Sequence, residues 1–264
     1  MNRKKLLKVL PWITTPGLLV VLFVVWELSV TALDVSPLIL PPPTMIFENL
    51  GTLLAQPGTW DNVRVTVIEI VLGFVAGTLA GVLVGVILGK LPLVEASVRP
   101  LIIALEVVPK VALIPLFVIW FGFGMTTKVI IAGLLAFFPV MLNVLLGVRS
   151  VDRGHRDLMQ SINASRWQTF RHLEFKSMMP HVFAGMETAI VLAVIGTIVG
   201  EYLGGNEGLG YMVVKTLNEL NAPALFAVIL MLATVGLIMY FIVTSFKRVA
   251  IPWHESVYGR KEVG

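Results

Sequence analysis

The sequence predicts an all-α polytopic membrane protein with six transmembrane helices. Of its 264 residues, 57% are hydrophobic and only 14% are charged, which is far from the balance of a soluble globular domain. A transmembrane helix needs about 20 predominantly apolar residues. Six segments meet this requirement, at about 12–33, 65–89, 100–121, 129–148, 182–200 and 223–246. We expect one transmembrane domain over residues 1–264, with a retained first span because no small-residue cleavage site ends it.

The distribution of Lys and Arg predicts the orientation of these spans. Sixteen of the 20 basic residues flank one set of span ends, three flank the opposite set, and Lys110 lies inside a span. Because Lys and Arg accumulate on the cytoplasmic side of a membrane, we expect both termini and the polar segment 150–180 to be cytoplasmic. Both termini can share a side only if the number of spans is even, which agrees with six.

The first external segment, residues 34–62, contains prolines that stop the preceding helix. A short helix is predicted from Thr44 to Leu54, with Thr44 as its cap.

Glycine recurs at every fourth position of the second span. Small residues at this spacing let another helix backbone approach closely. Because four residues exceed one turn of 3.6, the stripe drifts around the helix by about 40° per step. We therefore expect it to serve more than one neighbouring helix. The glycines are Gly73, Gly77, Gly81, Gly85 and Gly89.

The third span is irregular, because Pro109 and Pro115 interrupt it and Glu106 and Lys110 lie inside it. A charge near the middle of a membrane is costly unless it is paired or hydrated, which makes Lys110 a candidate functional residue. Glu106 and Lys110 are also four residues apart, in the order that favours a helical ion pair. Two interpretations stay open: a self-neutralising structural pair, and a role in a substrate path or a dimer interface.

Three more acids lie within predicted spans. Glu69 and Glu187 are near the ends of their spans, so we expect them at the membrane interface. Glu27 lies inside the first span, and the sequence offers no partner for it.

Segment 150–180 is the only long polar and basic interruption between spans. A helix is predicted to end near Ile162, because Asn163 suits the left-handed conformation that terminates a helix. Ser165 and the glutamine three residues later form the capping-box pattern that starts a second helix. We expect this second helix to stop near Pro180. An ordinary helical loop between two spans would have the same shape, so shape alone does not assign a function.

Four glycines between Glu201 and Leu220 predict a tight, bent external loop. Their spacing is similar to that of a glycine-rich nucleotide site. No strand precedes them, and the loop is predicted on the external side, so we reject that interpretation.

Segment 150–180 resembles the cytoplasmic EAA motif of bacterial ABC-importer permeases, in which it forms the coupling helix that docks on the ATPase subunit. The motif's Glu, Gly, Ala-Ser and closing Pro fall on Asp157, Asn163, Ala164, Ser165 and Pro180. Leu158 and Met159 replace the two alanines, which alters the packing of the first helix, and Asn163 replaces the Gly. The resemblance implies ATPase-coupling roles for Asp157, Ser161, Asn163, Ala164, Ser165, Arg166 and Pro180.

Other stretches resemble the nitrate, sulfonate and taurine branch of these permeases. They are LILPPPTMIFENL in the first external segment, PLFVIWFGFG at the end of the third span, GLGY in the glycine loop and PWH after the last span. Together they cover nearly the whole chain and imply the type I ABC importer permease fold.

The resemblance implies a permease subunit in the bacterial inner membrane rather than an enzyme. Expected partners are a cytoplasmic ATPase, an external substrate-binding protein, a second permease copy as a homodimer, and the lipid bilayer, but no nucleic acid. No G-x-x-x-x-G-K-[ST] motif occurs, so ATP hydrolysis is expected on a separate subunit. The chain has no cysteine, which excludes a thiolate metal site, and no cofactor is expected. Candidate residues of the substrate path are Glu106, Lys110, Trp120, Glu201, Tyr202 and Tyr211.

Two other classes of protein fit the sequence less well than a permease. A secondary transporter would show inverted internal repeats, and the sequence contains no convincing repeat. A membrane enzyme would gather His, Asp or Glu at one membrane depth, but the histidines lie outside the predicted spans. The sequence does not identify the substrate. It contains both a cation that could bind an anionic sulfonate and aromatic residues that could bind a heterocycle.

Overall fold

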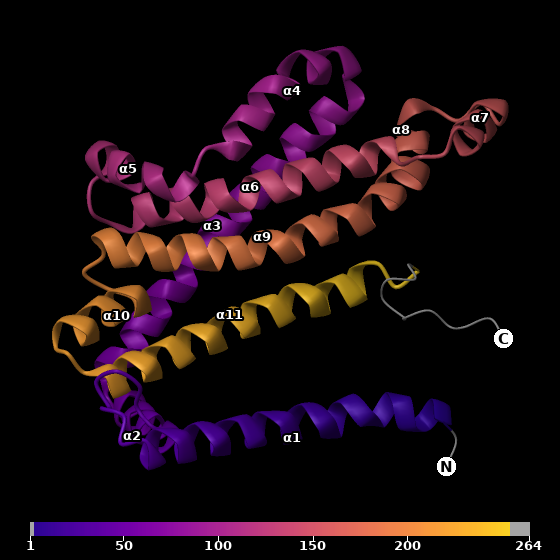
Figure 1. Cartoon of the computed structure of the whole chain (residues 1–264). Coiled ribbons are helices and arrows are strands. Elements are labelled where there is room, and N and C mark those ends of the chain that lie inside the picture. The colour runs from indigo at the N-terminus through magenta and orange to yellow at the C-terminus, as the bar shows by residue number, and fades with distance from the viewer. Residues whose placement is uncertain (1–2, 254–264) are drawn as a thin grey trace. The chain divides into compact units, whose positions relative to one another are not determined.

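The computed structural model describes residues 3–253, with side chains from Thr14 onward, and every regular element in this range is a helix (Figure 1). The side chains of the basic N-terminal residues and the end of the C-terminal tail lie outside this description. They include Arg3, Lys4, Lys5, Lys8, His254, Arg260 and Lys261.

Five long helices carry most of the described chain. They are α1 (Arg3–Ala32), α3 (Pro57–Lys90), α6 (Met125–Arg149), α9 (Phe175–Gly204) and α11 (Ala222–Ala250). Shorter helices connect them. They are α2 (Pro43–Leu54), α4 (Pro92–Val107), η1 (Lys110–Leu113), α5 (Ile114–Phe121), α7 (Arg153–Ser161), α8 (Arg166–Thr169), η2 (Phe170–Glu174) and α10 (Leu209–Asn218).

All five long helices are apolar enough to cross a membrane, α9 being counted together with the α8 and η2 turns that lead into it. A sixth span is formed when α4 is taken together with η1 and α5, which are bent by 81° relative to it. The bend falls at Val108 and Pro109, because proline disfavours helical conformation in the residue before it. Pro115 lies in the first turn of α5, where its missing N–H is tolerated. The predicted all-α membrane fold is therefore confirmed, with five candidate spans, or six when the broken third span is counted as one.

The chain folds as two compact units. The first contains the residues up to Asp61 together with Met212–Met231. The second contains Asn62–Tyr211 and the described residues from Leu232 onward.

In the first unit, the Glu27 carboxylate is hydrogen-bonded to the N-terminal turn of α2. It accepts hydrogen bonds from the Thr44 backbone amide (3.0 Å) and the Thr44 hydroxyl (2.8 Å). The predicted helix from Thr44 to Leu54 is confirmed, but the prediction that Thr44 caps it is wrong: Pro42 is the capping residue and makes no side-chain bond. A carboxylate from another helix satisfies the free amide instead, and a negative charge at a helix N-terminus is favourable.

In the second unit, the glycine stripe of α3 faces a single neighbour, α6. A Cβ added at each glycine would meet a residue of α6, in the order Gly73 with Ala132, Gly77 with Ala136, Gly81 with Val140, Gly85 with Val144 and Gly89 with Val148. The prediction that the stripe serves more than one helix is wrong. Both helices place small or β-branched residues at every fourth position, so the two ladders drift together and stay in contact.

The ladder also fixes the direction of the helices, because residue numbers rise together along α3 and α6. Two parallel helices joined in sequence need a connection that returns across their full length. The broken element α4–η1–α5 is that connection, which supports its assignment as one crossing of the membrane.

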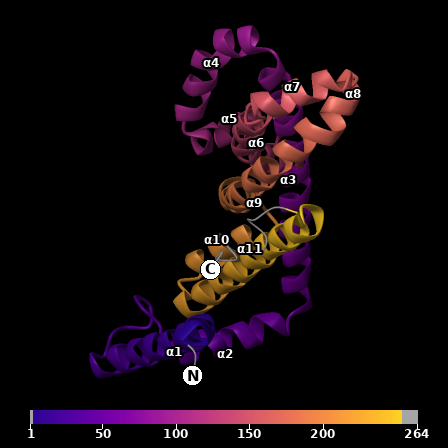
Figure 2. The same cartoon turned by 90° about the vertical axis from the view of Figure 1, so that its right-hand side faces the viewer.

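Helix α9 packs against α6 in the opposite direction (Figures 1 and 2). Gly147 lies against His181, while Gly196 lies against Ala132 near the other end. Their shared apolar core consists of Ala132, Ala136, Val140, Val144, Val148, Met178, Val182, Ala189 and Ala193.

Helix α11 packs on α9 through an ion pair and an aromatic contact. The Lys247 ammonium lies 3.1 Å from one Glu187 carboxylate oxygen, and the Phe246 and Phe183 rings are 5.8 Å apart. Glu187 therefore has a partner within the protein, which the sequence did not indicate. The end of α11 thus lies at the same end of this unit as the start of α9.

Candidate functional site

The predicted coupling segment, residues 150–180, begins with helix α7 and a sharp turn. Asp152 caps α7 by accepting a 2.7 Å hydrogen bond from the Gly154 amide. The helix ends at Asn163, whose φ of +53° confirms the predicted left-handed conformation. The amides of Asn163 and Ala164 donate to the carbonyls of Gln160 and Met159, both at 2.9 Å. This pair of bonds is the Schellman motif, which closes a helix and fixes the direction of the chain that leaves it.

A capping box starts the next helix immediately. The Gln168 amide donates to the Ser165 hydroxyl (3.2 Å), and the Ser165 amide donates to the Gln168 side chain (2.7 Å), as predicted. The two motifs are separated only by Ala164, which is half-buried. We call the turn at Asn163–Ser165 the elbow. The backbone amides of all three residues are hydrogen-bonded, so the elbow has a defined shape.

The predicted stop at Pro180 is wrong. Helix α8 continues through the π-helical turn η2 into α9, and Pro180 lies inside α9. The segment from Arg166 to Gly204 is long and apolar enough to count as one membrane-spanning unit. Helical structure is consequently continuous from Arg166 to the end of α9 at Gly204.

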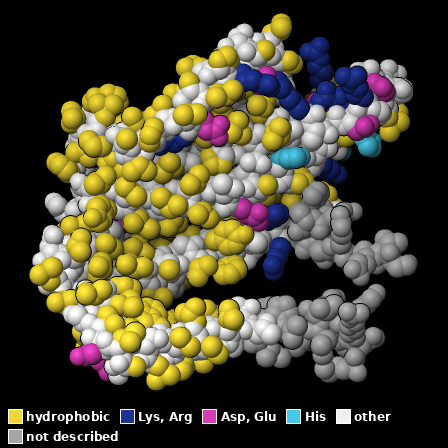
Figure 3. Space-filling view, viewed as in Figure 1, with side chains coloured by type: hydrophobic (Ala, Val, Ile, Leu, Met, Phe, Trp, Pro, Cys, Tyr) yellow, Lys and Arg dark blue, Asp and Glu magenta, His cyan; other side chains and the backbone are white. Residues whose placement is uncertain are grey.

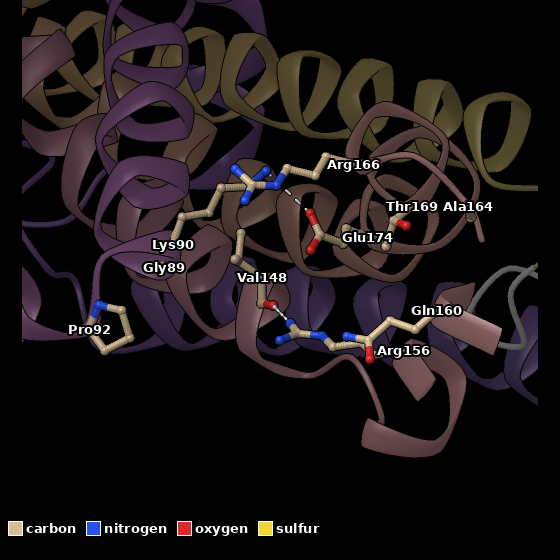
Figure 4. A pocket seen from close by; sticks show the side chains of 10 residues that line it. All are labelled: Gly89, Lys90, Pro92, Val148, Arg156, Gln160, Ala164, Arg166, Thr169 and Glu174. Atoms are coloured by element: carbon tan, nitrogen blue, oxygen red, sulfur yellow. Dashed lines mark hydrogen bonds and ion pairs between the residues drawn. The ribbon is translucent and has the colours of Figure 1, made fainter. Parts of the chain in front are cut away.

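Two contacts tie the segment to the ends of α3 and α6. The Lys90 ammonium lies 3.2 Å from the Glu174 carboxylate (Figure 4). It also lies 4.4 Å from the centre of the Phe170 ring, so it contacts both ends of η2. The Arg156 guanidinium donates a 3.3 Å hydrogen bond to the Val148 carbonyl. Figure 3 shows Lys and Arg side chains gathered around the α7–α8 end of this unit.

The remaining coupling candidates are exposed. The side chains of Asp157 and Arg166 have no hydrogen bond or ion pair among the described residues, and the Ser161 hydroxyl bonds only the Asp157 backbone carbonyl (2.9 Å). Exposed, unpaired side chains are available to a partner protein.

A further ion-pair network lies at the start of α4. Glu95 is buried and accepts from Arg99 (2.7 Å) and from Arg149 (3.0 Å), the last residue of α6. The sequence analysis did not single out this network. The feature of the sequence that indicates it is the i,i+4 spacing of Glu95 and Arg99, which favours an ion pair on one helical face.

Of the two interpretations of Glu106 and Lys110, the structure does not contain the ion pair. The Lys110 ammonium donates instead to the backbone carbonyl of Glu106 (3.0 Å) and lies 4.6 Å from the centre of the Phe138 ring. The helix ends at Val107, so the two side chains no longer share one helical face. Glu106 remains exposed.

At the other end of the unit, three consecutive amides of the glycine loop are bound by side chains. The bonds run from Gly208 to Asn62 (2.7 Å), from Leu209 to Thr66 (2.8 Å) and from Gly210 to Glu201 (2.6 Å). The Thr66 hydroxyl donates to the second Glu201 oxygen (2.6 Å). Glu201 is fully buried, and both of its carboxylate oxygens accept a hydrogen bond. Gly208 has a φ of +104°, and a side chain there would collide with the Glu201 carboxylate.

Beneath this loop lies a buried ion pair between Glu69 and Lys128, at 2.8 Å. Their side chains are 1% and 6% exposed, so Glu69 is paired inside the protein. The expectation that it lies at the depth of the membrane interface stays a prediction. The sequence did contain a signal: Asn62, Thr66 and Glu69 recur at the spacing that places residues on one helical face.

The aromatic path candidates do not join this cluster of bonds. Trp120 is 61% exposed and contacts the Phe117 and Phe121 rings. Tyr202 is exposed and Tyr211 is half-buried.

Comparison with known proteins assigns the class. Residues 77–250 match the family of binding-protein-dependent transport system inner membrane components. The chain is 33% identical to the riboflavin transport system permease protein RibX of Chloroflexus aurantiacus, over 93% of this chain and 92% of that protein. It is 31% identical to the taurine transport system permease protein TauC of Escherichia coli, over 91% and 90% respectively. The formylaminopyrimidine transport permease protein ThiX of Halalkalibacterium halodurans is 32% identical, over 89% and 93%.

The chain belongs to the binding-protein-dependent transport system inner membrane component family. It is an ABC importer permease of the branch that includes permeases for taurine, sulfonates and nitrate, and a transport subunit rather than an enzyme.

Proposed function

We propose that this chain forms half of the translocation path of an ABC importer, and that segment 150–180 receives force from a separate ATPase subunit. The observation that carries this proposal is the elbow at Asn163–Ser165, closed on both sides by backbone caps and continuous with α9. A floppy connection would absorb the movement of the ATPase, whereas this elbow passes it to a transmembrane helix.

In this proposal the α7–α8 end of the second unit faces the cytoplasm, as do both termini. The concentration of Lys and Arg at the predicted cytoplasmic ends supports this orientation. The glycine loop with Gly208 then faces outward, where an external binding protein delivers the solute. Its amides are already bound by side chains from α3 and α9, so a docked protein meets a preformed surface.

A second copy of the chain completes the path. The broken third span supports this assignment, because α4 and α5 leave apolar side chains exposed, including Val107 (77%) and Ile119 (78%). In one chain these surfaces are covered neither by α6 nor by α9, and a partner copy or lipid is needed to cover them.

The solute is proposed to be a small organic molecule. Relatives are named for riboflavin, a formylaminopyrimidine and taurine, which differ in charge and shape. The common features are small size and polar groups. Lys110 and Trp120 are the described residues of the third span that offer a cation and an exposed aromatic surface for such a solute.

Reconstitution tests the proposal. The chain is purified with its cognate ATPase, placed in liposomes and supplied with the loaded binding protein. Uptake is expected only when the ATPase and ATP are both present on the cytoplasmic side. Solute uptake by the chain without an ATP-hydrolysing subunit would assign it to the secondary transporters.

A further inference from the structure

A cavity of about 480 Å³ lies at the root of the elbow, between the ends of α3 and α6 and the helices α7, α8 and η2 (Figure 4). Ten residues line it, and they come from every element that meets at this point. They are Gly89, Lys90, Pro92, Val148, Arg156, Gln160, Ala164, Arg166, Thr169 and Glu174.

The charges around this cavity are unbalanced. Lys90, Arg156 and Arg166 are cationic, and Glu174 is the single carboxylate among the lining residues. Glu174 is already paired with Lys90 at 3.2 Å. The Arg156 guanidinium donates one hydrogen bond to the Val148 carbonyl. The Arg166 guanidinium has no hydrogen-bond or ion-pair partner in the part of the chain that the structure describes. Both arginines are exposed, and their remaining guanidinium donors lie around one cavity without a carboxylate partner among residues 14–253.

Two arginines arranged around one cavity suit a phosphate group. The guanidinium is planar and matches the oxygen spacing of phosphate with two parallel hydrogen bonds. The side-chain amide of Gln160, which has no hydrogen bond to another described residue, adds a further donor, and Val148 and Pro92 give the cavity an apolar wall.

The length of α3 supports a lipid headgroup as one source of the phosphate. Helix α3 has 34 residues, a length of roughly 51 Å, whereas a bilayer with its headgroups is about 40–45 Å thick. Lys90 is the last residue of α3 and so reaches the layer in which lipid phosphates lie.

We propose that this cavity binds a phosphate group, supplied by an anionic lipid headgroup or by free phosphate, between the elbow and the transmembrane helices. The bound phosphate bridges Arg156 on α7, Arg166 on α8 and Lys90 on α3. It stiffens the joint through which the elbow moves α9. Binding of the phosphate does not depend on the proposed transport function, although its effect on coupling does.

The test compares two double variants of the full chain that remove the same charge. Arg156→Gln with Arg166→Gln alters the cavity. Arg153→Gln with Arg171→Gln removes two exposed arginines of α7 and η2 that do not line it. Binding is measured at constant ionic strength in two arms. One arm titrates inorganic phosphate with the protein in zwitterionic nanodiscs, and the other compares phosphatidylglycerol with phosphatidylcholine.

Saturable binding in either arm that falls roughly tenfold or more in the cavity variant, but not in the matched control, supports the site. The arm in which this occurs identifies the source as free phosphate or lipid. The absence of saturable binding in both arms, or an equal loss in both double variants, overturns the proposal. Because neither arm contains an ATPase, failure of the site is distinct from failure of the proposed transport function.

Discussion

The ammonium group of Lys90 lies 3.2 Å from the Glu174 carboxylate and 4.4 Å from the centre of the Phe170 ring. One side chain at the end of α3 thus contacts both ends of η2, the turn through which the elbow continues into α9. The elbow is therefore attached to α9 through the continuous chain, to α3 through Lys90 and to α6 through the Arg156 bond to the Val148 carbonyl.

Replacing Lys90 with Gln removes the ion pair that attaches the elbow to α3. The pair is partly exposed, and such pairs contribute little to stability, so the unfolding temperature is expected to stay nearly constant. Transport is expected to fall several-fold, since changes in a coupling network amount to roughly 0.5–2 kcal/mol. Uptake and ATP hydrolysis are measured together in proteoliposomes. Lys90→Arg, which keeps the charge, serves as the control, and normal uptake by Lys90→Gln would show that this attachment is not used.

Replacing Ser165 with Ala removes one half of the capping box. Loss of such a cap costs about 1 kcal/mol, so hydrogen exchange of the α8 amides is expected to accelerate by roughly fivefold. Ser161→Ala is the matched control, because the Ser161 hydroxyl bonds only a carbonyl of its own helix and such bonds do not stabilise helices. Equal exchange rates in the two variants would mean that the box does not hold the elbow.

The packing of α3 on α6 predicts a contrast between two glycines. A methyl group at Gly77 would collide with the Gly133 carbonyl and Ala136, whereas one at Gly51 in α2 meets nothing within 4 Å. Gly77→Ala is expected to destabilise the protein by about 1–3 kcal/mol through overpacking. Gly51→Ala is expected to be neutral or to stabilise α2 by up to about 1 kcal/mol. Thermal unfolding in detergent compares them, and a Gly77→Ala protein as stable as the wild type would contradict the close contact.

The buried ion pair of Glu69 and Lys128 predicts that substitutions of the two residues have non-additive effects on stability. Lys128→Met leaves the Glu69 carboxylate buried without its cation, which typically costs about 3–5 kcal/mol. Adding Glu69→Leu removes the stranded charge and is expected to restore most of this stability. The partly exposed pair of Glu187 and Lys247 is the comparison, and Lys247→Met should cost less than Lys128→Met. Additive losses in the double variant would argue against direct pairing.

The parts of the structure that could be predicted from the sequence are those that depend on neighbouring residues. Asn163 and Ser165 act on the backbone within four positions, and both of their motifs are present. Pro109 breaks the third span by its effect on Val108. The number of spans follows from the length and apolarity of each segment, which are also local properties.

The remaining features depend on partners that lie far away in the chain. Glu27 meets Thr44, Glu69 meets Lys128 and Lys90 meets Glu174 only after the helices have packed. Pro180 fails as a stop because the continuous helix and its neighbours tolerate the one lost hydrogen bond, as often occurs in transmembrane helices.

Crosslinking tests most directly whether the elbow contacts the ATPase. The chain has no cysteine, so Ala164→Cys introduces a unique thiol at the elbow and Gly51→Cys a unique thiol on α2. In membranes that contain the cognate ATPase, a thiol crosslinker is expected to join the ATPase to the Ala164→Cys protein and not to the Gly51→Cys protein. An ATPase adduct at Gly51→Cys, or none at Ala164→Cys, would contradict the account.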